Sequence, residues 1–396
     1  MQFDFQSPEF ITNPYPVYAQ LREQAPVYLV EPGVWLITRY HDVEHLLKSP
    51  LLDKDVPSVF DQRYGRNMND EPVYRIHNNF WVSMGLPSRR KLIVKALNAG
   101  KTSELRVLVQ KSAEQLVDKW IGDGQADLRT VFAYPLPVQV TCNMLNIELQ
   151  QSLDFLAETK LMARTAEPSP LTAEELDIAN AAALRLEAFF REICRQRRKQ
   201  PGDDLVSQLL AAEEDGERLS EDEIISNLII LFVAGYGTTA NALCNTLRLL
   251  FLYPEQRELL IAKPELLSSA VEEGLRFSSS APITARTAIE AVELHGFQIA
   301  PGDTVYLALD SANHDPEVFD EPDRFWIERP PAAKKSLAFG QGNHYCLGAK
   351  LGFMEVEVAL ETLFRRLPNL TIDNIDQLKW EPTWVLRGLE SLPARW

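Results

Sequence analysis

The sequence is poor in cysteine, in long apolar runs and in positive charge. Cys142, Cys194, Cys244 and Cys346 are its four cysteines; they lie far apart, and none belongs to a CxxC pair. Four cysteines are too few to staple a chain of 396 residues, which is long enough to bury a core of its own. The cysteine content therefore excludes a disulfide-based scaffold and fits a reducing compartment.

The apolar and charged residues exclude further classes of protein. The longest apolar run, Leu228–Ala234, is far shorter than the ~20 residues that span a bilayer. Met1–Phe10 has no basic stretch followed by an apolar one, so we expect no signal peptide. The 40 basic and 56 acidic side chains give a net charge of −16, which disfavours binding to nucleic acid or to anionic membrane surfaces. We expect an acidic, soluble protein of the cytoplasm.

The first half of the chain has two clear local signatures. Val27–Val30 and Val34–Thr38 flank a Glu-Pro-Gly turn, which is typical of a hairpin between two short strands. Thr172–Arg198 has the apolar spacing of one long amphipathic helix, and its first residue forms a capping box with Glu175.

A second capping box, Ser220 with Glu223, begins an apolar stretch that ends at Leu252. This pattern predicts a helix of about 32 residues, ~48 Å long and buried on most sides. The segment Ala234-Gly-Tyr-Gly-Thr-Thr239 within it contains two glycines. A glycine inside a helix costs ~1 kcal/mol relative to alanine, so the segment indicates close backbone approach, a deformed helix or tight helix packing.

Beyond Phe277 the pattern becomes strand-like. Val292–His295, Phe297–Ile299 and Val305–Leu307 are short apolar runs separated by turn residues. Many helices followed by a few late hairpins predict a mainly α protein with small β-sheets, which we expect to form a single domain over residues 1–396.

Three of the cysteines lie in helical apolar contexts, where a thiol is a small buried hydrophobe. Cys346 differs, because it sits among glycines in Phe339-Gly-Gln-Gly-Asn-His-Tyr-Cys346-Leu-Gly-Ala-Lys350, just before a helical pattern. A dinucleotide fingerprint is excluded because Tyr345 stands where its last glycine is required. A zinc site is excluded because no second His/Cys pair accompanies His344 and the cysteine.

A cysteine in a glycine loop at a helix N-terminus is stabilised as thiolate by the helix dipole and the free backbone N–H groups. Such a thiolate is either a nucleophile or a soft metal ligand. A nucleophile needs a histidine base, and His344 is too near in sequence to be well placed. An axial iron ligand needs only N–H donors, and glycines let the backbone approach a flat macrocycle closely.

The pattern Phe339-Gly-x-Gly-x-His-x-Cys346-x-Gly348 resembles the heme-binding loop of the cytochrome P-450 heme-thiolate monooxygenases. Glu273-Gly-Leu-Arg276 is similar to that family's Glu-x-x-Arg pair, and Ala234-Gly-x-x-Thr-Thr239 is similar to its oxygen-binding groove. Their order along the chain also matches the family. The resemblance covers nearly the whole chain and implies the cytochrome P-450 fold of the soluble bacterial type, with heme b between the long central helix and the helix after the cysteine.

The resemblance also implies roles for single residues. Cys346 matches the thiolate that binds the heme iron, and Arg90, Arg286 and His344 match the cations that bind the heme propionates. A histidine usually lies four residues before the first of these arginines, and here that position is Leu86. The resemblance adds further heme contacts: Phe339, Gly340, Gly348, Ala234 and Gly235.

Glu273 and Arg276 match a pair that the family buries as a structural brace, with Arg324 or Arg329 as its third member. Alone, the pair would be an ordinary surface ion pair worth under ~1 kcal/mol. We expect it to brace the loop before the cysteine.

The oxygen side departs from the family. Thr238 matches the groove threonine, but Gly237 stands where most members carry an acid that relays protons together with it. Either water, a substrate group or another acid must then deliver protons, unless the glycine makes room for a bulky substrate.

Electrons are expected from a separate ferredoxin and its reductase, since no flavin or nicotinamide fingerprint occurs in the chain. Lys350, Arg365 and Arg366 near the cysteine, with a second basic group at residues 89–95, are candidates for the ferredoxin's docking face. A carrier protein is a further candidate partner, and we expect a monomer.

Residues at the family's pocket positions are apolar and imply a hydrophobic small molecule, which we expect to be a secondary-metabolite intermediate such as a polyketide or peptide: Phe80, Trp81, Leu161, Met162, Phe232, Ala281, Ile283, Trp384 and Val385. We therefore predict a monooxygenase that hydroxylates or epoxidises such a molecule with O₂.

Two alternatives to this function stay open. One is a peroxide-using fatty-acid hydroxylase, although the groove lacks the arginine that would hold a carboxylate. The other is a non-catalytic heme-binding sensor or carrier.

Overall fold

A computed structural model of the chain describes residues 3–54, 56–97, 102–150, 155, 161–162, 164–165, 170–213, 216–330 and 335–396. The chain divides into two compact units. Unit 1 comprises residues 1–53, 109–137 and 238–396, and unit 2 comprises residues 54–108 and 138–237. Among the helices that the structure describes, three have residues in both units: α7 (Thr102–Trp120), α8 (Pro135–Leu145) and α13 (Glu221–Leu252).

Unit 1 holds the described β-sheets and seven further helices. The helices are α1 (Pro8–Thr12), α2 (Tyr15–Gln24), α3 (Tyr40–Lys48), α14 (Pro254–Ala262), α15 (Leu267–Phe277), α16 (Leu309–Asn313) and α17 (Ala349–Arg366). Short 3₁₀ turns lie at Ile121–Asp123, Pro264–Leu266, Gly342–His344 and Ile375–Gln377, and Arg129–Ala133 is a π-helical turn.

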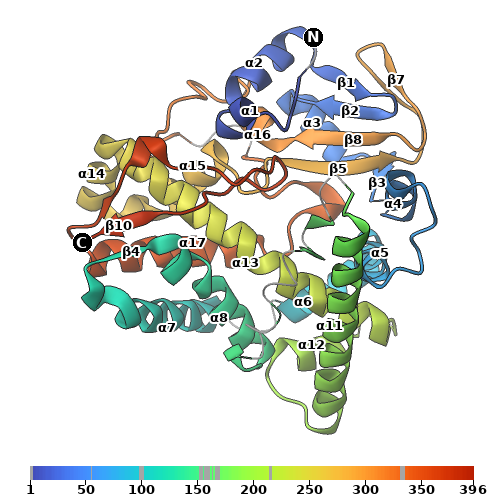
Figure 1. Cartoon of the computed structure of the whole chain (residues 1–396), viewed down its shortest axis with the longest axis horizontal. Helices are drawn as coiled ribbons and strands as arrows, with labels where there is room; N and C mark the ends of the chain where they lie inside the picture. The colour runs from blue at the N-terminus through green and yellow to red at the C-terminus, as the bar shows by residue number, and fades with distance from the viewer. Residues whose placement is uncertain are drawn as a thin grey trace. The chain divides into compact units, whose positions relative to one another are not determined.

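The largest sheet of unit 1 has five strands in the order β1-β2-β8-β5-β3 (Figure 1). They are β1 (Val27–Glu31), β2 (Val34–Ile37), β8 (Thr304–Ala308), β5 (Ile283–Ala288) and β3 (Leu52–Asp53). β2 and β8 pair in parallel, and the other neighbours pair antiparallel. The buried face of this sheet packs against α3 and α16 in one hydrophobic cluster that includes Ile37, Val43, Leu307 and Ala312. The sheet thereby joins segments more than 250 residues apart in sequence.

Two smaller sheets complete unit 1. β4 (Gln125–Asp127), β10 (Pro393–Arg395) and β9 (Thr371–Ile372) form a three-stranded sheet. β6 (Val292–Leu294) and β7 (Phe297–Ile299) form the hairpin that the sequence predicts. The left-handed conformations of His295 and Gly296 make the turn between them.

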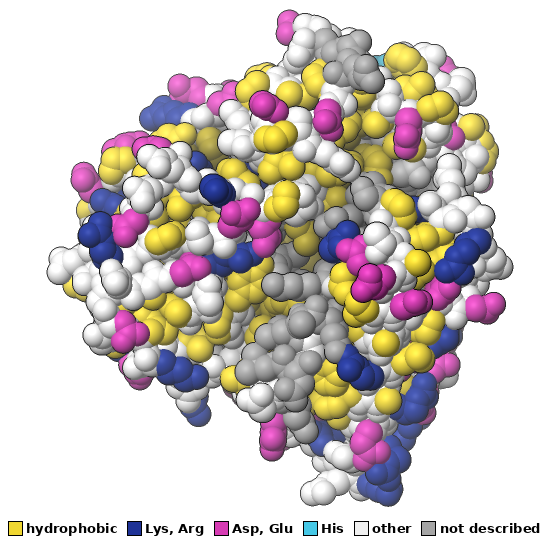
Figure 2. Space-filling model, viewed as in Figure 1, with side chains coloured by type: hydrophobic (Ala, Val, Ile, Leu, Met, Phe, Trp, Pro, Cys, Tyr) yellow, Lys and Arg dark blue, Asp and Glu magenta, His cyan; other side chains and the backbone are white. Residues whose placement is uncertain are grey.

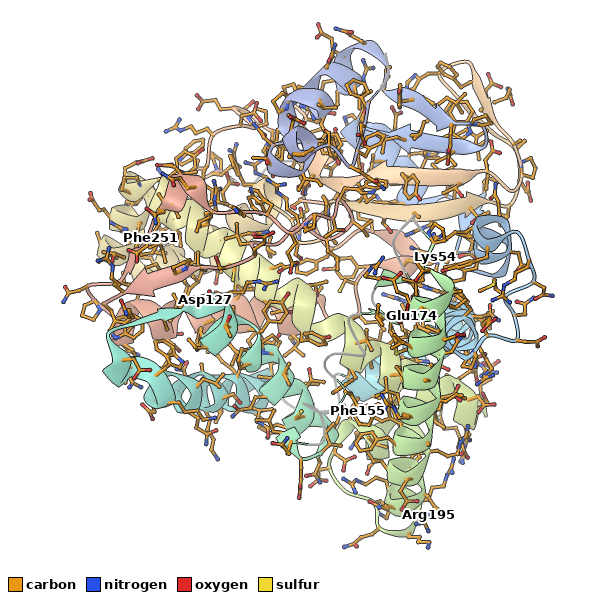
Figure 3. All side chains as sticks on the ribbon, viewed as in Figure 1. Lys54, Asp127, Phe155, Glu174, Arg195 and Phe251 are labelled. Carbon is orange, nitrogen blue, oxygen red and sulfur yellow. The ribbon has the colours of Figure 1, made fainter. Side chains whose placement is uncertain are left out.

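Unit 2 is helical in its described residues. Its helices are α4 (Val56–Tyr64), α5 (Pro72–Gly85), α6 (Pro87–Leu97), α11 (Ala173–Lys199) and α12 (Leu205–Ala211). α11 packs against α5 and α12. The Thr172–Glu175 capping box forms at the start of α11, as the sequence predicts. Figure 3 labels Glu174 and Arg195 near the two ends of this helix, and basic side chains gather at its C-terminal end (Figure 2).

The central helix α13 is continuous over 32 residues and passes through the Ala234–Thr239 segment without a break. Its capping box forms as predicted, since the Ser220 hydroxyl accepts a hydrogen bond from the Glu223 N–H and the Glu223 carboxylate accepts one from the Ser220 N–H. By length and composition this helix could cross a membrane, but 67 % of its most apolar window is buried, as in the core helix of a soluble protein. The two glycines therefore do not interrupt the helix.

The mainly α architecture with small sheets confirms the predicted fold class. Cys142, Cys194 and Cys244 are buried, as expected of small hydrophobes, and the four cysteines form no disulfide among the described residues. The sequence predicts a single domain over residues 1–396, and this stays a prediction. The structure divides the chain into two compact units.

Candidate functional site

The cysteine loop joins the strand-rich part of unit 1 to α17. The Cys346 N–H donates to the Phe339 carbonyl over 3.0 Å and closes the loop on itself. Gly340 and Gly342 adopt left-handed backbone conformations, with φ of 66° and 72°. A Cβ at Gly342 would collide with the Leu47 carbonyl oxygen, so this position requires glycine for space as well as for conformation. The loop therefore leaves Cys346 exposed just before the first turn of α17.

Cys346 opens into a cavity of about 200 Å³ in unit 1. Among the polar side chains of its wall are Thr238 and Thr239 from α13, Arg286 from β5, and His344 with Cys346 from the loop. Apolar groups make up most of the remaining lining, which comprises Ala242, Leu275, Ser280, Ala281, Ile283, Thr284, Leu309, Ala338, Phe339, Gly340 and Gly352. Eight residues that the sequence predicts for the site thus line one cavity: Thr238, Ala281, Ile283, Arg286, Phe339, Gly340, His344 and Cys346.

Arg286 is a buried cation in this wall. Its side chain is about as buried as a core residue, 4 % exposed, and its hydrogen bonds go to neutral oxygens, those of Thr284 and the Ala285 carbonyl. Burial lowers the pKa of Arg286 to about 10, and the charge of Asp53 offsets this only in part. A buried guanidinium of this kind favours an anionic ligand in the cavity. His344 lies at the same wall with its Nε2 2.7 Å from the Asp53 carboxylate.

The brace predicted around Glu273 is present and buried. Arg276 Nε and Nη2 lie 2.7 and 2.8 Å from the two carboxylate oxygens of Glu273, and Arg329 Nε lies 3.0 Å from Oε2. Arg276 also donates to the carbonyls of Asn313 and Pro322. The third member is Arg329 and not Arg324, whose guanidinium binds Glu321 at the surface. These contacts tie α15 to the irregular segment that precedes the cysteine loop.

Other predicted residues lie in unit 2. Arg90 is on α6, with Nη1 3.7 Å from the Met84 sulfur. Phe80 packs edge-on against Trp81 at 4.8 Å between ring centroids, and Phe232 packs against Phe190 at 6.0 Å. Ala234 and Gly235 are on the unit 2 part of α13. Their roles stay predictions.

Trp384 and Val385 do not line the cavity around Cys346. Both pack against the hydrophobic cluster of the N-terminal segment, where Trp384 stacks on Phe5 at 5.3 Å and meets Tyr306 edge-on at 5.2 Å. Both side chains are partly buried against that cluster, and their role in a substrate pocket stays a prediction.

The basic residues near the cysteine helix are largely compensated by acids. Arg365 and Arg366 both bind Glu114 of α7, and Arg366 also lies 2.7 Å from Asp118. In unit 2, Arg89 binds Glu223. The expected docking face is therefore weaker in net positive charge than the sequence indicates.

Sequence reasoning missed Glu355 of α17. This glutamate is buried, and its carboxyl group hydrogen-bonds the Thr239 hydroxyl. Its position in the sequence carried a signal, because Glu355 falls between Leu351 and Val358 at the i,i+4 and i,i+3 spacings of the apolar helix face. A charged residue on that face indicates a buried carboxyl group.

The cavity fits a heme in three respects. The Cys346 side chain is accessible at its wall, and the buried Arg286 supplies a counter-charge for a carboxylate. Cβ atoms built at Gly340 and Gly348, on either side of Cys346, would meet no described atom within 4 Å. Gly340 lines the cavity, so the backbone leaves room there for a flat ligand.

Comparisons with known proteins show the family of this chain. The sequence model of the family "Cytochrome P450" matches residues 22–387. The chain is 36 % identical to "Putative cytochrome P450 133B1" of Xylella fastidiosa over 98 % of this chain and 97 % of that protein. It is 36 % identical to "Mycinamicin IV hydroxylase/epoxidase" of Micromonospora griseorubida, over 96 % and 94 % of the two chains.

Among solved structures, the chain is similar to P450BioI in complex with hexadec-9Z-enoic acid ligated acyl carrier protein. The TM-score is 0.87 at 30 % identity, covering 98 % of this chain and 100 % of that one. This likeness confirms the predicted fold, and the fold and the family imply heme b as the cofactor. The chain therefore belongs to the cytochrome P450 family of heme-thiolate monooxygenases.

Proposed function

We propose that this monooxygenase hydroxylates or epoxidises a hydrophobic small molecule, an intermediate of secondary metabolism such as a polyketide or peptide. The observation that carries the proposal is the shared cavity of Cys346, Thr238 and Arg286, whose remaining wall is mostly apolar. Ala281, Ile283 and Leu309 give that wall its apolar groups. Such a wall selects a substrate by burial of apolar surface, with few polar contacts to orient it.

Cys346 is the proposed axial ligand of the heme iron. It lies three residues before Ala349, the first residue of α17, where backbone N–H groups and the helix dipole favour a thiolate. Arg286 and His344 are proposed to bind the heme propionates from the cavity wall, and Arg90 is proposed as a third cation. Bound heme supplies dioxygen activation, and electron donation by a thiolate ligand favours O–O cleavage.

The partners are proposed to be O₂, a ferredoxin and its reductase. The ion pairs of Arg365 and Arg366 limit the docking face to a mixed charged surface, so we expect a moderate salt dependence of the ferredoxin reaction. A carrier protein is proposed as a second partner because P450BioI was solved with an acyl carrier protein and is similar over the whole chain.

A substrate-binding screen tests the proposed substrate class. Mycinamicin IV, free hexadec-9Z-enoic acid and the same acid on an acyl carrier protein are added separately, and the shift of the heme absorbance is recorded. We expect mycinamicin IV to shift the spectrum at the lowest concentration. A response to the fatty acid alone would contradict the proposed class.

Turnover then separates the enzymatic alternatives. Each ligand that shifts the spectrum is incubated with ferredoxin, reductase and NADPH, or with hydrogen peroxide alone. We expect an oxygenated product with the ferredoxin system. A fatty-acid product formed with peroxide alone indicates a peroxide-using hydroxylase, and no product in either case indicates a heme-binding sensor or carrier.

A further inference from the structure

Two exposed histidines lie one turn apart on α3. The buried residues of this helix mark the side that faces the core: Tyr40, Val43, Leu46 and Leu47. His41 and His45 are exposed and stand at positions i and i+4 of the same helix. Side chains at this spacing share one helix face, with their Cβ atoms about 5–6 Å apart. The two imidazoles are therefore neighbours on the solvent side of α3.

The other histidines of the chain are engaged elsewhere. The chain has six histidines, and all of them belong to the described residues. Four have hydrogen-bond partners: Thr165 for His77, Asp42 for His295, Asp323 and the Phe277 carbonyl for His314, and Asp53 for His344. The ring of His41 meets the Tyr40 ring edge-on, with 5.8 Å between the centroids. Among the described residues, no hydrogen bond or ion pair occupies a ring nitrogen of His41 or His45.

The helix that carries the pair is held at both ends. In its first turn, the Tyr40 N–H donates to the Asp315 carboxylate over 2.8 Å. At its C-terminal end, the Leu47 carbonyl lies so close to Gly342 of the cysteine loop that a Cβ there would collide with it. The buried face between these ends belongs to the hydrophobic cluster of the five-stranded sheet. Ligands on a fixed helix are already positioned, so little conformational entropy is lost when they close on a common ion.

The charges on α3 favour a cation beside the pair. Lys48 Nζ lies 2.9 Å from Glu44 Oε1, so the positive charge of this lysine is compensated. Asp42 adds a second carboxylate to the helix, and the whole chain has a net charge of −16. These negative charges attract a divalent cation to the surface of the helix.

We propose that His41 and His45 form a surface site for a divalent transition-metal cation of the kind that prefers imidazole, such as Zn²⁺, Ni²⁺ or Cu²⁺. One nitrogen of each neutral imidazole binds the cation, and water occupies the remaining coordination positions. The described residues contain no group of three or more His, Cys, Asp or Glu side chains that could hold a metal, so this is a site with two protein ligands. A structural zinc site has four protein ligands, and a site with two is expected to exchange its metal with the solvent.

A metal at this site links two successive turns of α3. A ligand that binds the folded helix and not the unfolded chain stabilises the fold by mass action. The Leu47 carbonyl of the same helix lies against the cysteine loop, so the stabilised segment is one that supports that loop. Neither histidine lines the cavity around Cys346, and the site is therefore independent of the proposed oxidation.

Binding is tested by calorimetric titration of the untagged ferric holoenzyme with Ni²⁺ alone. We expect one site per chain. His41→Gln and His45→Gln should each weaken the affinity by about tenfold or more, because a single imidazole loses the high effective concentration of the second. The matched control is His295→Gln, which removes an exposed histidine outside the pair and should bind Ni²⁺ as the wild type does.

The chemistry of the site is tested by the choice of cation and by pH. Two imidazoles should bind Cu²⁺ more tightly than Ni²⁺, and Ni²⁺ more tightly than Co²⁺. An excess of Mg²⁺, which prefers oxygen ligands, should not displace Ni²⁺. The affinity should fall at acidic pH, because a histidine must be neutral to bind a metal.

The two ligands are counted by electron paramagnetic resonance of Cu²⁺ added at less than one equivalent. The wild type and His295→Gln should show coupling of the copper electron to two nitrogen donors, and each variant of the pair should show fewer. In urea-induced unfolding, Ni²⁺ should raise the midpoint of the wild type and leave those of His41→Gln and His45→Gln unchanged. Both substitutions are at exposed positions, so the metal-free variants should unfold at the wild-type midpoint.

The outcomes separate this inference from the proposed function. Equal Ni²⁺ affinity in the wild type, His41→Gln and His45→Gln would overturn the site, and so would a wild-type Cu²⁺ spectrum with a single nitrogen donor. Either result leaves the heme-thiolate assignment intact, because the absorbance of the reduced carbon monoxide complex is recorded in every variant without added metal. A failed substrate screen, in turn, leaves the metal titration unchanged.

Discussion

Two buried glutamates of unit 1 lie on packed helices and have opposite surroundings. Glu273 on α15 is 4 % exposed and is surrounded by two guanidinium groups, so that both of its oxygens accept charged hydrogen bonds. Glu355 on α17 is 2 % exposed, and its carboxyl group has one hydroxyl partner and one unpaired oxygen. Helices α15 and α17 pack against each other, so the two groups share a core.

The difference shows that the available cations, not burial, decide what a buried carboxyl group does. Two arginines bind both oxygens of Glu273 and make it a fixed strut between α15 and the segment before the cysteine loop. Glu355 has no cation beside it among the described residues, and burial raises its pKa to about 8. Similar exposure therefore gives a structural brace in one place and an acid in the other.

The largest effect is expected from breaking the brace. Glu273→Gln leaves the buried guanidinium groups of Arg276 and Arg329 without a counter-charge, which should lower the free energy of unfolding by about 3–5 kcal/mol. Urea-induced unfolding measures the loss. The matched control is Glu272→Gln, the exposed neighbour in sequence, which should change the stability by less than about 0.5 kcal/mol. A similar loss of stability in both variants would contradict the view that the buried Glu273 braces the fold more than an exposed glutamate does.

The pH dependence of stability should differ between the wild type and Glu355→Gln. The pKa of Glu355 rises from an ordinary value of 4.5 to about 8 in the folded state, so between these pH values the folded protein binds the extra proton. Stability from this group is therefore lost as the pH rises from 4.5 to 8 and is constant above that range. The free energy of unfolding, measured at several pH values, should increase for Glu355→Gln relative to the wild type over this window. The difference between Glu361→Gln, a variant at an exposed position of the same helix, and the wild type should stay constant.

Replacing each glutamate by an apolar residue sharpens the same contrast at a fixed pH. Glu355→Leu removes an unpaired buried oxygen and should raise the free energy of unfolding by about 1 kcal/mol at pH 7. Glu273→Leu should lower it, since the arginines remain. Thermal or urea unfolding of the two variants decides the sign, and a destabilised Glu355→Leu would indicate that the carboxyl group is structural.

The smallest effect is expected at the exposed end of α17. Arg365→Gln breaks a half-exposed ion pair with Glu114, whose carboxylate keeps its contact with Arg366. The free energy of unfolding should therefore change by less than about 1 kcal/mol. Adding salt should shrink this difference further, whereas it should leave the Glu273→Gln effect nearly unchanged.

Local signals in the sequence predicted the helices and the hairpins well. The capping boxes at Thr172 and Ser220 mark the true starts of α11 and α13, because such hydrogen bonds involve residues only three apart. The parallel pairing of β2 with β8 was not predicted. Val34 pairs there with Thr304, 270 positions along the chain, and no local pattern encodes such a partner.

In the candidate site, too, the features encoded by local motifs were predicted, and those that depend on packing between distant segments were not. The glycine-rich motif around Cys346 is local and was found in the sequence, as was the i,i+3 spacing of Glu273 and Arg276. The choice between Arg324 and Arg329 depended on the path of an irregular loop, which places only Arg329 on Glu273. The contact of Glu355 with Thr239 depends on how α17 packs against α13, and the sequence showed only a misplaced charge on an apolar face.

The assignment of Cys346 as the heme ligand is tested most directly by the absorbance of the reduced, carbon monoxide-bound protein. The wild type should show the red-shifted band that gives the family its name, and Cys346→Ser should lose that band while the circular dichroism of its helices is retained. A wild-type protein that binds heme without the red-shifted band, or a Cys346→Ser variant that keeps it, would contradict the account.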